Sequence, residues 1–151
     1  MITRLSATDR NNKVEEFEVT QESFTEGNYP GIRYKIGKPN ISQFRYFEFC
    51  TLELPNDSIL IYMLINHNHQ DLMEKGIVKA MIKSLSMDLR KNIVSSTNKQ
   101  HLKISESEGR IHDMTKAWIK WKSEMNNIEY LKEEDRFIYR TLAPVTTILE
   151  N

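Results

Sequence analysis

Alternating apolar and polar residues predict strands through the first third of the chain. Residues 2–8 and 14–20 flank the polar cluster DRNNK, so together they predict a hairpin. Residues 31–38 alternate in the same way and predict a half-buried strand. The intervening TEGNYPG, residues 25–31, combines Gly, Asn and Pro and predicts a loop.

The next apolar segments predict the centre of a sheet. Residues 44–54 predict a long strand in which Tyr46, Glu48 and Cys50 share one face. PNDS then predicts a tight turn. Residues 59–65 are nearly all apolar, which is typical of a central strand covered on both faces.

The second half of the chain predicts two helices. Residues 78–89 carry one apolar stripe, and residues 111–125 carry another that includes both tryptophans. Ile93 and Val94 predict a short strand between them, and the polar residues 97–109 predict a flexible loop. IEYL, a charged turn and RFIYRTL close the chain with two more strands.

This order predicts one α+β domain over residues 1–151, with a mixed, mostly antiparallel sheet and two main helices. The strands on either side of helix 78–89 need a crossover, so we expect them to be parallel. The other strands are joined by short turns, so we expect them to be antiparallel.

Composition narrows the functional classes. The 151 residues have zero formal net charge, so no global field attracts nucleic acid or an anionic membrane. The N-terminus lacks the apolar core of a signal peptide, and the longest apolar run is too short to span a bilayer. Cys50 is the single cysteine and is expected to be a buried, inert thiol. A cytoplasmic location and no membrane partner are the resulting expectations.

A local excess of basic residues is the first hint of a ligand. Residues 75–103 contain seven basic side chains against Asp88 alone: Lys75, Lys79, Lys83, Arg90, Lys91, Lys99 and Lys103. Such a surface suits a ligand that carries phosphate groups. The alternative is the solvated face of an ordinary helix.

Residues 44–140 resemble the GNAT superfamily of N-acetyltransferases in the order of their elements. Residues 75–81, KGIVKAM, resemble the turn and helix that receive the coenzyme A pyrophosphate in that family. Gly76 fills the first glycine of the motif, and Val78 takes the place of the second small residue. No helix is predicted before the central strands, so the resemblance is to an abbreviated or divergent member.

The resemblance implies a cofactor site for acetyl-CoA. Backbone amides near Leu64 and Asn66 would hold the thioester, and the helix start at Gly76, Ile77 and Val78 would hold the pyrophosphate. Asn98 would face the pantetheine arm, although a turn-forming role is equally open.

The function implied is transfer of an acetyl group to an amine. Glu48, His67 or His69 would take the proton from the attacking amine. Trp118 or Trp121 stands where the family places a tyrosine acid, and Tyr130 or Tyr139 could replace that acid only if the fold brings it near. His67-x-His69 also suits two metal ligands, but no third ligand accompanies the pair, so we predict no metal site.

Two other functions stay open. The first is a non-catalytic protein-binding or regulatory module on the same scaffold, in which Val78 would block the pyrophosphate path. The second is nucleic-acid binding, through the lysines of residues 75–103 or through the alternating Lys and Trp of residues 116–122. We expect Trp118 and Trp121 to pack on the sheet instead, which argues against nucleic acid as the partner. The expected partner is a small-molecule or protein amine, and self-association into a homodimer is left open.

Overall fold

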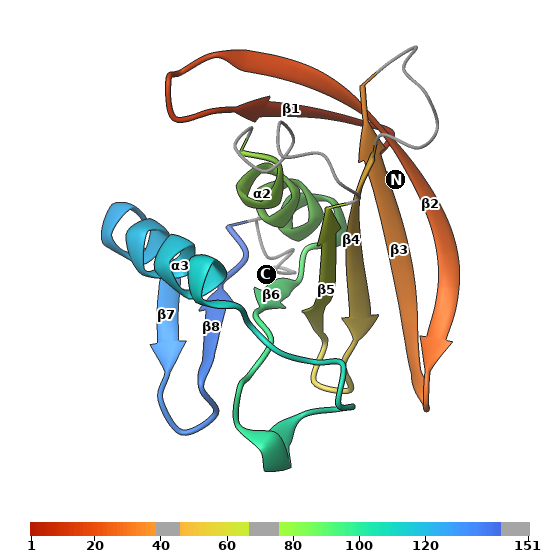
Figure 1. Cartoon of the computed structure of the whole chain (residues 1–151), viewed down its shortest axis with the longest axis vertical. Helices are drawn as coiled ribbons and strands as arrows, with labels where there is room; N and C mark the ends of the chain where they lie inside the picture. The colour runs from red at the N-terminus through yellow and green to blue at the C-terminus, as the bar shows by residue number, and fades with distance from the viewer. Residues whose placement is uncertain (39–45, 67–75, 143–151) are drawn as a thin grey trace, which may run out of the picture.

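The computed structural model describes residues 1–38, 46–66 and 76–142 (Figure 1). These residues form the α+β fold that the sequence predicts. The strands are β1 (Arg4–Thr8), β2 (Val14–Glu26), β3 (Tyr29–Gly37), β4 (Tyr46–Glu53), β5 (Ser58–Asn66), β6 (Asn92–Val94), β7 (Ile128–Leu131) and β8 (Arg136–Tyr139). The helices are α2 (Ile77–Leu89), the 3₁₀ turn η1 (Gln100–Leu102) and α3 (His112–Glu124).

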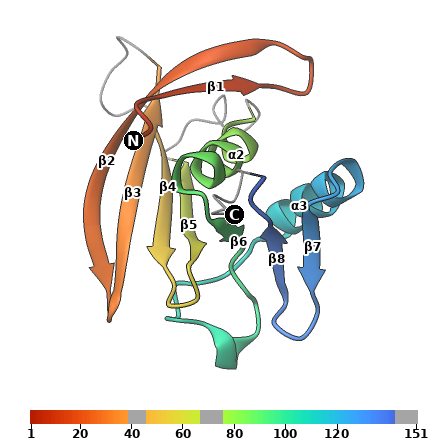
Figure 2. The ribbon, with the colours of Figure 1, turned by 180° about the vertical axis from the view of Figure 1, so that it is seen from behind.

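All eight strands belong to one curled sheet, in the order β1-β2-β3-β4-β5-β6-β8-β7 (Figures 1 and 2). The pair β5–β6 is parallel and the other described pairs are antiparallel, which confirms the predicted mixed sheet. Strand β8 lies between β6 and β7, so the last hairpin enters the sheet by its second strand. No described helix is long and apolar enough to cross a membrane.

Apolar side chains pack on both faces of the sheet. One cluster joins the sheet to Met81 and Leu85 of α2 and to Trp118 of α3. Trp118 is 1% exposed and stacks on Phe137 of β8, with ring centroids 5.6 Å apart. Trp121 packs against the same cluster, so the prediction that both tryptophans lie on the sheet is confirmed. The opposite face carries a smaller cluster around Leu60 of β5.

One predicted loop is part of a β-hairpin, and another contains a short 3₁₀ turn. Residues 25–31 are not a loop, because β2 continues to Glu26 and β3 begins at Tyr29. A two-residue turn suffices here, since Gly27 adopts a φ of +58°. Residues 97–109 form a loop as predicted, but it contains the 3₁₀ turn η1, and the Thr97 and Ile104 amides both donate to the Glu108 carboxylate. The predicted strand beginning at residue 44 starts, within the described residues, at Tyr46.

The hairpin of β1 and β2 reaches over α2, as both ribbon views show (Figures 1 and 2). The hairpin lies close to Gly76, the residue directly before α2, whose φ is +76°. A Cβ atom built on Gly76 would lie 2.2 Å from the carbonyl oxygen of Thr8. Glycine is therefore required here both by the backbone conformation and by the contact with β1.

We predict that Gly76→Ala destabilises the fold more than Gly27→Ala does. Both positions have a positive φ, but a Cβ on Gly27 meets no atom within 4 Å. The excess loss for Gly76→Ala should be about 1–3 kcal/mol, since overpacking costs that much. Urea denaturation of the two variants measures the difference. Equal losses would show that β1 does not hold Gly76 closely.

Candidate functional site

The central feature of the site is the early separation of β5 from β6. These parallel strands pair over three residue pairs only, from Ser58↔Asn92 to Leu60↔Val94. Beyond Leu60, β5 continues for six residues to Asn66 with no strand neighbour on the β6 side among the described residues. This part of β5 therefore presents an open strand edge.

The segment after β6 leaves β5 because it follows β8 instead. The Ser95 amide donates to the Phe137 carbonyl at 2.8 Å, and the Phe137 amide donates to Ser95 Oγ at 2.9 Å. Further along, Thr97 Oγ1 donates to the Glu134 carbonyl at 2.6 Å. At the point of separation, Ser96 Oγ donates to the Ile61 carbonyl at 2.7 Å and joins the two diverging chains.

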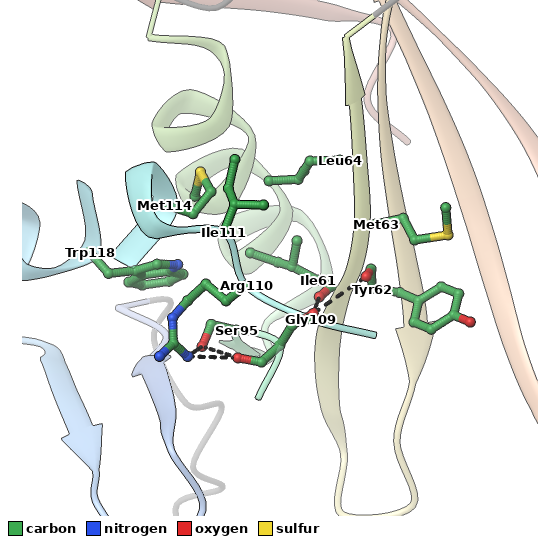
Figure 3. Close-up of a pocket in the computed structure, with 11 residues that line it drawn as sticks. Ile61, Tyr62, Met63, Leu64, Ser95, Gly109, Arg110, Ile111, Met114 and Trp118 are labelled. Atoms are coloured by element: carbon green, nitrogen blue, oxygen red, sulfur yellow. Dashed lines mark hydrogen bonds between the residues drawn. The ribbon is translucent and has the colours of Figure 1, made fainter. Parts of the chain in front are cut away.

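A β-bulge in β5 marks the same position. Cys50 of β4 pairs with Met63, but the next residue, Thr51, pairs with Ile61, so Tyr62 has no partner in β4. A bulge leaves the extra residue outside the ladder and re-aims its neighbours. Tyr62 and Met63 consequently both point away from α3, whereas Ile61 and Leu64 point toward it (Figure 3).

A pocket of about 80 Å³ lies in the gap between the separated chains, and we call it the split pocket. Its residues come from β5, from the segment after β6 and from the start of α3: Ile61, Tyr62, Met63, Leu64, Ser95, Ser96, Gly109, Arg110, Ile111, Met114 and Trp118. The side chains of Ile61, Leu64, Ile111 and Met114 surround the space in Figure 3. The split pocket is therefore mostly apolar on its inner surface.

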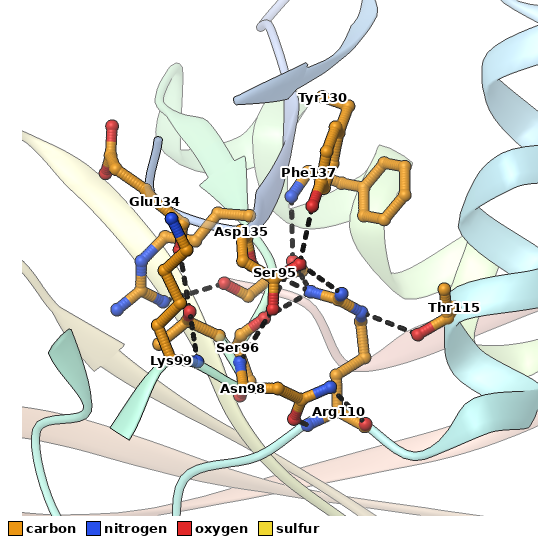
Figure 4. A network of polar contacts seen from close by, with 12 residues as sticks. Ser95, Ser96, Asn98, Lys99, Arg110, Thr115, Tyr130, Glu134, Asp135 and Phe137 are labelled. Atoms are coloured by element: carbon orange, nitrogen blue, oxygen red, sulfur yellow. Dashed lines mark hydrogen bonds and ion pairs between the residues drawn. The ribbon is translucent and has the colours of Figure 1, made fainter. Parts of the chain in front are cut away.

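Arg110 fixes the polar wall of the split pocket. Its side chain is 5% exposed and lies 5.2 Å from the ring centroid of Phe137. Nη1 donates to the carbonyls of Ser96 and Asp135, and Nη2 donates to Asp135 Oδ1 at 2.8 Å (Figure 4). Burial tends to raise the pKa of the Asp135 carboxyl, but hydrogen bonds from Arg110 and Tyr130 outweigh it and hold that pKa below its usual range.

A second buried ion pair, between Glu108 and Arg136, connects the loop that precedes Arg110 to β8. Glu108 is 1% exposed, and its Oε2 accepts hydrogen bonds from Arg136 Nη1 and from the Thr97 amide. Its Oε1 accepts from the Ile104 amide at 2.9 Å. Arg136 Nη1 also donates to the Ser95 carbonyl at 2.8 Å. Through these bonds the Glu108–Arg136 pair connects Ser95, Thr97 and Ile104 to β8.

A larger cleft lies on the other side of α2, between the β1–β2 hairpin and the two helices. We call it the cationic cleft; its volume is about 650 Å³. Four basic and two acidic side chains are among its lining residues: Arg10, Lys79, Lys83, Lys120, Asp9 and Glu124. Lys79 lies 3.4 Å from Glu124, whereas no ion pair involving Lys83 or Lys120 is present within the described part of the chain. The cleft is large enough for a small-molecule ligand and carries a net positive charge.

The predicted cofactor residues fall at both sites. Leu64 lines the split pocket, and Asn66 is the last residue of β5. Gly76 lines the cationic cleft at the start of α2. Ile77 is 2% exposed and Val78 packs against the main core cluster, so their side chains serve the fold.

Asn98 has a structural role in the polar wall. Its Oδ1 accepts from the Arg110 amide, and its Nδ2 donates to the Arg110 carbonyl. Both the oxygen and the nitrogen of the side-chain amide are therefore bonded to the Arg110 backbone, on the far side of the loop. A contact between Asn98 and a pantetheine arm stays a prediction.

Among the described residues, the predicted base Glu48 and the tyrosines Tyr130 and Tyr139 do not line the split pocket. Glu48 is buried, and its Oε1 lies 3.6 Å from Arg33 Nε, on the same face of β4 as Cys50. Tyr130 donates to Asp135, which raises the pKa of its phenol, and neither it nor Tyr139 lines the pocket. His67 and His69 lie outside the described residues.

Within residues 1–38, 46–66 and 76–142, no group of three or more His, Cys, Asp or Glu side chains is arranged to hold a metal ion. Cys50 is 2% exposed, as predicted, and burial raises the pKa of its thiol.

Sequence reasoning missed the residues that build the site, namely Ser95, Ser96, Glu108, Arg110 and Arg136. The polar residues 97–109 predict only a flexible loop. An acid and an arginine placed close together in a segment that directly precedes an amphipathic helix were the available signal. Their partners on β8 could not be identified without the topology.

We predict that Glu108→Gln lowers the free energy of unfolding by about 3 kcal/mol. The substitution keeps the volume of the side chain but leaves Arg136 as a buried cation without its counter-ion. Glu129→Gln is the control, because the Glu129–Arg140 pair is about half exposed and should contribute far less. Equal urea midpoints for the two variants would contradict this account of residues 95–108.

Comparison of the chain with protein-family models, with curated proteins and with solved structures finds no match.

Proposed function

We propose that this chain binds an acyl-coenzyme A thioester and transfers the acyl group to an amine. The observation that carries the proposal is the separation of β5 from β6, with a bulge and an apolar pocket at the point where they part. The resemblance to the GNAT superfamily implies a parallel strand splayed away from the central sheet and a closing strand pair. The strand order of the described sheet is in keeping with this.

The open edge of β5 suits an extended ligand with amide groups. An unpaired edge offers backbone N–H and C=O groups with which an added strand-like chain can pair. The pantetheine arm of coenzyme A is extended and contains two amides. The arm would lie along β5 beyond Leu60, with the thioester in the split pocket near Leu64.

The cationic cleft suits the phosphate end of the same ligand. It opens at Gly76, where α2 begins, and contains Lys79 and Lys83 of α2 and Lys120 of α3. Positive charge and the amides of a helix start both favour phosphate groups. The contact of Gly76 with Thr8 excludes a phosphate from the space over its Cα, so the lysines would provide the binding.

In the proposed reaction the amine nitrogen attacks the thioester carbonyl, and the coenzyme A thiolate leaves. A base takes the proton from the amine, and the thiolate is protonated as it departs. His67 and His69 follow β5 in the sequence and are the proposed bases. Glu48 is the other proposed base, but its ion pair with Arg33 lies away from the split pocket.

A second candidate function is a cofactor-binding module that does not catalyse transfer. It is favoured by one observation. The described residues that line the split pocket include no His, Asp, Glu or Cys that could act as the base. In this case the chain would bind coenzyme A and present the complex to a partner.

We predict micromolar binding of acetyl-coenzyme A in a calorimetric titration. The double variant Lys83→Ala, Lys120→Ala should weaken binding about ten-fold, because it removes two charges from the cationic cleft. Lys122→Ala is the matched control, since Lys122 lies on α3 but does not line the cleft. S-acetyl-N-acetylcysteamine carries the thioester without phosphates, so it should bind with equal affinity to the wild-type protein, the double variant and the control variant.

The proposal fails if the wild-type protein does not bind acetyl-coenzyme A at millimolar concentration. It also fails if the control variant weakens binding as much as the double variant does.

Transfer to amines separates the two candidate functions. Incubation with acetyl-coenzyme A and a panel of amines should release thiol in proportion to acylated product. The double variant His67→Ala, His69→Ala should abolish this release and retain cofactor binding. Cofactor binding without any transfer by the wild-type protein would favour the non-catalytic module.

A further inference from the structure

The inner surface of the split pocket is more apolar than an acetyl group requires. Ile61 and Leu64 of β5 face Ile111 and Met114 at the start of α3 (Figure 3). The buried indole of Trp118 forms part of the same lining. Burial of an aliphatic chain against these side chains is favourable because apolar surface is removed from water.

The side chains of Arg110, Ser95 and Ser96 around the pocket are already hydrogen-bonded to the protein. Arg110 directs Nε to Thr115 Oγ1, Nη1 to two carbonyls and Nη2 to Asp135 (Figure 4). Ser95 Oγ donates to the Ser96 carbonyl and accepts from the Phe137 amide. Ser96 Oγ donates to β5. A polar acyl group would have to displace these bonds or remain unpaired, which is costly.

The volume of the pocket limits the length of the chain it can hold. An engineered protein cavity of about 150 Å³ accommodates benzene, which amounts to about 25 Å³ for each carbon. The split pocket, at about 80 Å³, therefore has room for about three carbons. Three carbons beyond the thioester carbonyl make a butyryl group.

We propose that the split pocket selects a short, unbranched aliphatic acyl group, propionyl or butyryl, in preference to acetyl. This inference rests on the proposed function, because it places the thioester at the mouth of the split pocket. The chain enters between Leu64 and Met114 and ends against Trp118. The substrate class is a saturated short-chain acyl thioester of coenzyme A.

A chain-length series tests the proposal by calorimetry with coenzyme A and its acetyl, propionyl, butyryl and hexanoyl thioesters. Affinity should rise about four-fold with each methylene from acetyl to butyryl. Hexanoyl-coenzyme A should bind no more tightly than butyryl-coenzyme A, because the pocket is then full.

Two variants of α3 make the test specific to the pocket. Met114→Ala enlarges the pocket and should move the tightest binding from butyryl to hexanoyl. Ile119→Ala is the control, since Ile119 is 56% exposed and does not line the pocket. Thermal melting of each variant verifies that it is folded, and Met114 is only half-buried, so the fold should tolerate its truncation.

The outcomes separate this inference from the proposed function. If coenzyme A and its acetyl thioester do not bind, the proposed function fails and the acyl-chain inference fails with it. If all the thioesters bind equally, or Met114→Ala leaves the preference for butyryl unchanged, the cofactor site stands and the acyl-chain inference is overturned.

Discussion

The attachment of residues 95–98 to β8 is the constraint on which the site depends. A β-α-β unit would ordinarily extend its two parallel strands side by side, but here β6 ends after Val94. Ser95 bonds Phe137, and the Asn98 amide donates to Asp135, so this segment runs beside the last hairpin. Within the described residues, β5 beyond Leu60 is left without a strand neighbour on this side as a direct consequence.

Two buried arginines make this arrangement rigid. Arg136 and Arg110 each bond backbone carbonyls of Ser95 or Ser96 and a carboxylate, Glu108 or Asp135. A buried ion pair adds little net stability when compared with an apolar core, but breaking one is costly. Such pairs therefore hold residues 95–110 in one conformation. A pocket wall that binds a chain of defined length needs this rigidity.

The sequence was sufficient for the elements and insufficient for the site. Period-two alternation and the apolar stripe of α2 identified the strands and helices, because burial on one face determines both patterns. The tight turn at Gly27 was missed because Gly, Asn and Pro are common both in long loops and in two-residue hairpin turns, so the sequence did not distinguish the two. The glycine at Gly76 was assigned to phosphate binding, whereas its contact with Thr8 depends on a hairpin distant in the sequence.

The candidate site shows the same division. The resemblance to the GNAT superfamily singled out Leu64, and Leu64 lines the split pocket. Arg110 and Glu108 could not be predicted, because their roles depend on partners on the β7–β8 hairpin. Asn98 was expected to face a ligand. Its side-chain amide instead bonds the Arg110 backbone, and no local sequence pattern reveals this partner.

The proposed cofactor site and the proposed acyl-chain preference both require a coenzyme A thioester in the gap between β5 and the segment after β6. Titration of the ¹⁵N-labelled protein with butyryl-coenzyme A, followed by amide NMR shifts, tests this placement most directly. The account predicts that the largest changes cluster at residues 61–64, 95–96 and 110–114, with a second group near Lys83. Changes confined to other surfaces, or no changes at saturating ligand, would contradict it.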